Sequence, residues 1–72
     1  MIEQEAGRYG TALNQFNHAV NLSPGSSMPW LMRGMVMEQM GEREGAIESY
    51  QRAAEAAPDD PRPKQMLAGL QE

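Results

Sequence analysis

The sequence contains no cysteine, so disulfides, thiol catalysis and cysteine-ligated metal centres are all excluded. Lysine and arginine are scarce, six among 72 residues, and they do not cluster along one stripe; the net charge is −4. A nucleic-acid-binding surface is recognised by a basic patch, which this sequence does not have. No apolar run approaches the roughly 20 residues of a membrane-spanning helix. We therefore expect a single small domain that neither binds nucleic acid nor inserts into a membrane.

Residue patterns that would support catalysis or hold a cofactor are missing as well. The one histidine, His18, falls beside asparagines on the polar side of a helical pattern, whereas a metal site needs several converging ligands. Four glutamates surround Gly41. An acid–base pair is conceivable there, but solvated helix ends are the simpler interpretation. No GxSxG, phosphate-loop or HExxH motif occurs. We expect no enzyme, and no catalytic, cofactor-binding or metal-binding residues.

The pattern of apolar residues predicts helices throughout the chain. Strand-like alternation is absent, and apolar side chains recur at spacings of three and four, as on one face of an amphipathic helix. We predict four helices, over residues 10–22, 27–40, 44–57 and 61–71, and we interpret residues 2–6 as the last turn of a further helix.

Residues with special backbone preferences mark the predicted helix ends. Ser26 is suited to cap the second helix, and Gly41 suits the left-handed residue that terminates it. Pro61 suits the first position of the last helix, where its missing N–H group has no helical partner. These signals support the predicted boundaries around residues 27–40 and 61–71.

An internal repeat appears when residues 7–24 are written above residues 41–58. The matched pairs are Gly7 and Gly41, Ala12 and Ala46, Phe16 and Tyr50, Ala19 and Ala53, and Pro24 and Pro58. All of these pairs are 34 residues apart, and Pro29 and Pro63 continue the same register. A fixed period of this length is typical of repeat architectures.

These residues resemble the tetratricopeptide repeat, a helix–turn–helix unit of 34 residues. The residues that carry the resemblance are Trp30 at the first large apolar site, the small Gly34, the turn residue Gly41, the small–aromatic–small series Ala46, Tyr50 and Ala53, and the closing Pro58. Two positions depart from the family pattern, because Arg33 replaces the usual leucine and Met37 the usual tyrosine.

The resemblance implies an all-α fold, a right-handed α-solenoid of antiparallel helix pairs with about four helices. It divides the single domain into a partial first repeat over residues 1–24, a complete repeat over residues 25–58, and a terminal or capping helix over residues 59–72. Gly34 and Met37 would then lie on the face of residues 27–40 that packs against the second helix of the same unit.

The resemblance also implies a non-catalytic protein–protein interaction module. Its partly apolar concave groove would bind a peptide or helix of a partner protein. The expected groove residues are Leu31, Met35, Glu38, Gln39, Arg62 and Gln65. Methionine suits adaptable binding surfaces. Three other methionines, Met32, Met37 and Met40, are expected to pack in the core.

Self-association is the alternative function. Each unit of a repeat protein leaves an apolar face for a neighbour to cover, and arrays usually contain three or more units. One complete repeat between two partial ones could therefore form a homo-oligomer or part of a longer scaffold.

Overall fold

A computed structural model describes the backbone of residues 2–71 and the side chains of residues 8–70. Within residues 2–71 the chain forms four α-helices and no strand: α1 (Ile2–Leu22), α2 (Ser27–Gln39), α3 (Arg43–Ala56) and α4 (Pro61–Gln71). The predicted all-α fold is confirmed. None of these helices has both the length and the apolar character needed to span a bilayer.

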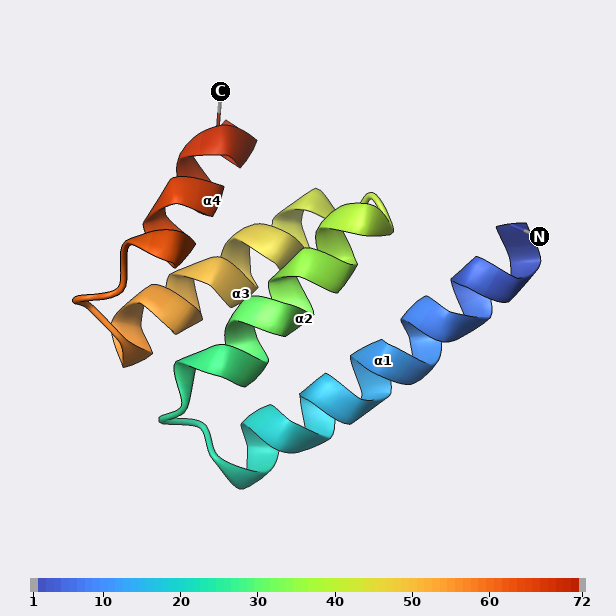
Figure 1. Cartoon of the computed structure of the whole chain (residues 1–72), viewed down its shortest axis with the longest axis horizontal. Helices are drawn as coiled ribbons and strands as arrows, with labels where there is room; N and C mark the ends of the chain where they lie inside the picture. Colours follow the sequence, from blue (N-terminus) through green and yellow to red (C-terminus); the bar gives the residue numbers. More distant parts are fainter. Residues whose placement is uncertain (1, 72) are drawn as a thin grey trace.

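Consecutive helices run antiparallel and lie side by side in a single layer (Figure 1). The most extensive contact is between α2 and α3, while α1 packs on α2 and α4 packs on α3. The chain measures 38 × 32 × 15 Å, so it is little more than one helix layer thick. Each helix can therefore present side chains on a broad face of the molecule.

The boundaries of α2, α3 and α4 follow the predicted ones closely. Ser26 occupies the N-cap of α2 with extended backbone angles, although its side chain makes no capping hydrogen bond. Gly41 has a φ of 83°, the left-handed conformation expected of a residue that ends a helix. Pro61 is the first residue of α4, as predicted.

The prediction for the N-terminal segment was wrong. Residues 2–6 are not the end of a separate helix, because α1 continues without interruption from Ile2 to Leu22. Gly7 aligns with Gly41 in the repeat, yet it lies inside α1 and forms no turn. One interior glycine costs a helix only about 1 kcal/mol, which is too little to end it among good helix formers.

The core lies where α2 and α3 approach each other. Leu31, Ala46, Tyr50 and Ala53 form its buried cluster. A Cβ atom on Gly34 would lie 2.5 Å from the ring of Tyr50, so only glycine allows this approach. The expected role of Gly34 as the small residue between the paired helices is therefore confirmed.

Arg33 occupies a polar junction between three helices. Its Nε donates a hydrogen bond to Oδ1 of Asn17 on α1 at 2.6 Å, and its Nη1 donates to Oγ of Ser49 on α3 at 2.5 Å. The guanidinium also lies 5.7 Å from the ring centroid of Trp30. An arginine is accommodated here because hydrogen bonds and an aromatic ring replace the water that it loses.

Candidate protein-binding surface

Three methionines form an exposed apolar row along α2. Met28, Met32 and Met35 are 46%, 38% and 37% exposed, and spacings of four and three residues place them on one face of the helix. We call these three residues the methionine strip. Neighbouring apolar side chains that remain in contact with water often mark an interaction site.

Leu31 does not belong to the exposed surface, so the expectation that it is exposed in the groove was wrong. Its side chain is 4% exposed and is a member of the core cluster. Met66 and Leu67 of α4 pack against the same cluster. The neighbouring helix therefore contributes to the apolar region that encloses Leu31, whereas Met35 stays accessible.

The three methionines that were expected in the core behave differently from one another. Met37 packs against the core cluster, and Oγ of Ser49 donates a hydrogen bond to its sulfur at 3.8 Å. Met32 and Met40 are instead 38% and 41% exposed, so for these two the expectation was wrong. Met32 belongs to the methionine strip, and Met40 is the C-cap residue of α2.

Glu38 lies at one end of the strip and is held by a tyrosine. The hydroxyl of Tyr50 donates a hydrogen bond to Oε1 of Glu38 at 2.7 Å, and Tyr50 itself is fully buried. Burial first, then the hydrogen bond and the charge of Glu38, raise the pKa of Tyr50 well above its usual value. The phenol is therefore a neutral donor that fixes the carboxylate in place.

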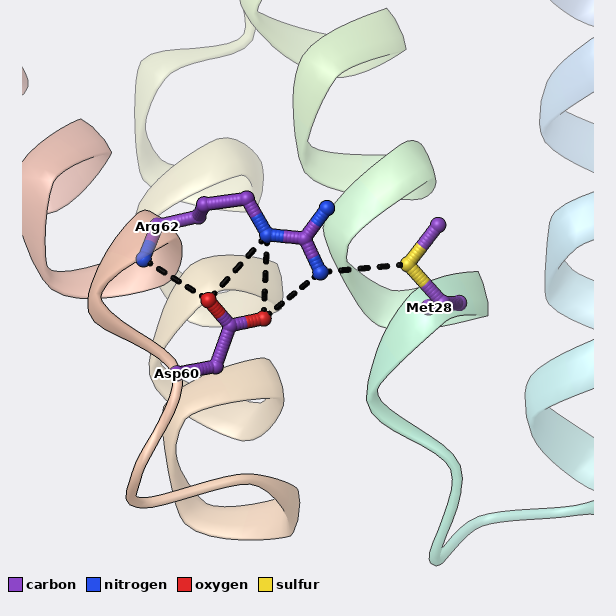
Figure 2. Close-up of polar contacts among 3 residues, drawn as sticks. All are labelled: Met28, Asp60 and Arg62. Carbon is purple, nitrogen blue, oxygen red and sulfur yellow. Dashed lines mark hydrogen bonds and ion pairs between the residues drawn. The ribbon is translucent and has the colours of Figure 1, made fainter.

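Arg62 lies at the other end of the strip, where Figure 2 shows it bridging the start of α4 and α2. Its guanidinium binds both carboxylate oxygens of Asp60, with Nη2 2.7 Å from Oδ2. Nη2 also lies 3.7 Å from the sulfur of Met28. Hydrogen bonds from the Arg62 side chain and backbone lower the pKa of the Asp60 carboxyl. The charges of Asp60 and Arg62 thus neutralise each other.

The two remaining predicted residues are exposed, one on each of α2 and α4. Gln39 is exposed next to Glu38 on α2, and Gln65 is exposed on α4 one turn beyond Arg62. Met28 was not predicted, although a signal for it exists. It stands 34 residues before Arg62, so the two occupy the same position in successive units.

Two hollows lie beside Trp30, which contributes to the wall of both. One, of about 350 Å³, is lined by Asn17, Val20, Asn21, Trp30, Arg33 and Glu48. The other, of about 250 Å³, is lined by Pro24, Gly25, Trp30, Arg52, Glu55 and Ala56. The indole Nε1 donates to the carbonyl of Pro24 at 3.2 Å. No three His, Cys, Asp or Glu side chains converge as metal ligands among the described residues.

Comparison with models of known protein families matches residues 4–70 to the tetratricopeptide repeat. The match covers nearly the whole chain. Neither the curated proteins nor the solved structures include a match to this sequence.

Proposed function

This chain belongs to the tetratricopeptide repeat family, whose units are typically non-catalytic protein–protein interaction modules, and we propose that it binds a partner segment along α2 and α4. The segment would lie across the methionine strip. Met35, Glu38, Gln39, Arg62 and Gln65 would contact it. Leu31 would support the surface from below.

The exposure of Met28, Met32 and Met35 on one helical face is the observation that carries this proposal. Methionine side chains are flexible and polarisable, so they adapt to the shape of an apolar partner. The strip extends over about 10 Å, from the helical rise per residue. That length accommodates two turns of an amphipathic helix or a short extended peptide.

The polar residues around the strip resemble the rim of a protein interface. Glu38 and Gln39 follow the strip along α2, and Nη2 of Arg62 on α4 lies 3.7 Å from the sulfur of Met28. An apolar centre within a polar rim is the usual organisation of such interfaces. The rim would orient the partner, while burial of the methionines would supply most of the binding free energy.

The decisive test compares two methionines of nearly equal exposure. Met32→Glu places a charge inside the strip, whereas Met40→Glu places the same charge at the C-cap of α2, outside the strip. A panel of synthetic amphipathic peptides with leucine and methionine anchors serves as the probe, and fluorescence anisotropy of the labelled peptides measures Kd. We expect Met32→Glu to weaken binding at least about tenfold, since the charge must be desolvated against an apolar anchor.

Met40→Glu should leave Kd within about twofold of the original protein. Circular dichroism must show equal helix content for both variants. Equal loss of binding in the two variants, or binding that neither variant alters, would contradict a binding site on the strip.

Self-association is the second candidate, and α1 favours it. Leu22 is 71% exposed, and Leu13 and Phe16 are only partly buried. Sedimentation velocity over a concentration series tests this function. Dimers that dissociate in the double variant Leu13→Gln and Phe16→Gln, which changes two neighbouring side chains on one face of α1, would support it. A monomer at every concentration would rule it out.

A further inference from the structure

We propose that the partner segment of this chain is basic and amphipathic, with a lysine or arginine that binds the carboxylate of Glu38. This inference rests on the proposed function, because the cation would be recognised beside apolar anchors on the methionine strip. The inference specifies that the partner segment carries a positive charge, and it specifies which end of that segment lies beside Glu38.

The first argument is the state of the Glu38 carboxylate. Its Oε1 accepts a hydrogen bond of 2.7 Å from the buried Tyr50 hydroxyl. A neutral phenol donor leaves the negative charge in place, and no basic side chain forms an ion pair with Glu38 within the described part of the chain. A carboxylate that is already oriented loses less conformational entropy when it binds a cation.

The second argument is that the positive charge at the opposite end of the strip is already paired. Both carboxylate oxygens of Asp60 bind the guanidinium of Arg62 (Figure 2). Lys64 follows two residues later, which places it on a different face of α4, and its Nζ lies 3.4 Å from the carbonyl oxygen of Pro58. An acidic partner would therefore meet a guanidinium that Asp60 already binds, whereas a basic partner would meet the Glu38 carboxylate, which has no ion-pair partner among the described residues.

The third argument is the position of Glu38 relative to the apolar anchors. Glu38 follows Met35 by three residues, so the two side chains are neighbours on the helix surface. The distance along α2 from Met28 to Glu38 is about 15 Å. A partner helix of about ten residues could place apolar side chains on the strip and a basic residue at its end. The formal net charge of −4 also favours encounter with a basic segment.

The test uses three synthetic peptides that differ at one position. They share the leucine and methionine anchors of an amphipathic helix and carry lysine, glutamine or glutamate beside the last anchor. Kd is measured for the original protein, for Glu38→Gln, and for the control Glu44→Gln, which removes an exposed carboxylate near the start of α3.

We expect the lysine peptide to bind the original protein about tenfold more tightly than the glutamine peptide, and the glutamate peptide to bind most weakly. Glu38→Gln should remove most of the advantage of lysine, and Glu44→Gln should leave it intact. The advantage should shrink as salt rises from about 0.05 to 0.5 M, because exposed charges are screened.

Tyr50→Phe tests whether the tyrosine positions the carboxylate. Phenylalanine keeps the buried ring but removes the hydroxyl, so the charge of Glu38 remains while its orientation is released. We expect an advantage of lysine over glutamine between those of the original protein and Glu38→Gln, with unchanged binding of the glutamine peptide.

The outcomes separate this inference from the proposed function. Equal binding of the lysine and glutamine peptides to the original protein would overturn the basic partner, as would an advantage of lysine that survives Glu38→Gln. If Met32→Glu still abolishes binding in these cases, the site on the strip stands without the cation. If Met32→Glu has no effect on any peptide, the proposed function itself fails.

Discussion

Gly34 on α2 allows a close approach of the Tyr50 ring, which any side chain at this position would block. The Tyr50 ring lies where a Cβ atom on residue 34 would stand, at 2.5 Å, and Tyr50 has no exposed surface into which it could move. Gly10 lies inside α1 with no atom within 4 Å of an added Cβ. The two glycines therefore differ in the space around them.

Gly34→Ala should destabilise the fold by about 1–3 kcal/mol, because the added methyl group forces α2 and α3 apart or distorts the Tyr50 side chain. Gly10→Ala should instead stabilise it by up to about 1 kcal/mol through helix propensity. Urea denaturation followed by circular dichroism measures both values. Similar midpoints for the two variants would contradict the close contact.

The hydrogen-bond partners of Arg33 could not be predicted from the sequence alone. The position usually holds leucine in the family, so the arginine departs from the family pattern. Its partners Asn17 and Ser49 each lie 16 residues away, on different helices. No local pattern identifies such partners, because they depend on how α1, α2 and α3 pack.

At the scale of the element, the turn between α2 and α3 depends on one backbone conformation. Gly41 has positive φ, and its N–H donates to the carbonyl of Glu38 at 3.1 Å. Gly25, in the turn between α1 and α2, does not have positive φ. An alanine would therefore be strained at one turn and tolerated at the other.

Gly41→Ala should cost about 1–2 kcal/mol, the penalty for a side chain in the left-handed region. Gly25→Ala should change the free energy of unfolding by less than about 0.5 kcal/mol. Thermal and urea unfolding of the two variants provide the measurement. A larger loss in Gly25→Ala would show that the turn before α2 is the more constrained one.

The ends of three helices could be predicted because their signals are local. Ser26, Gly41 and Pro61 act within one turn of the helix that each bounds. α1 was predicted too short, because residues 2–6 were interpreted as the end of a further helix, next to a glycine that aligns with Gly41. A glycine ends a helix only where neighbouring residues also favour the turn.

At the scale of the whole molecule, the 34-residue period was enough to predict an all-α helical-repeat fold. It was not enough to predict which groove residues are accessible. Leu31 and Met35 are four residues apart on α2, yet one is 4% exposed and the other 37%. The difference depends on packing with other helices, including α4. That packing is set by the angle between units, which the sequence pattern does not specify.

The pH dependence of stability should include an alkaline transition that belongs to Tyr50. Burial and Glu38 raise the pKa of its hydroxyl in the folded state. Stability is therefore complete below the unfolded pKa of about 10 and falls as pH rises above that value. Urea midpoints of the original protein should stay level from about pH 8 to about pH 10 and fall between about pH 10 and 11. Tyr50→Phe should flatten this fall, and an unchanged slope would show that Tyr50 is not its source.

The indole of Trp30 also gives the chain an optical reporter. It is the one tryptophan of the sequence, and the guanidinium groups of Arg33 and Arg52 lie 5.7 and 5.8 Å from its ring centroid. Indole emission responds to nearby charges and to water, so its wavelength and intensity monitor the place where α1, α2 and α3 meet. A spectral change on adding a partner would show that binding on the methionine strip alters the environment of Trp30 on the opposite side of α2. An unchanged spectrum would show that the strip binds its partner without a change in conformation where α1, α2 and α3 meet.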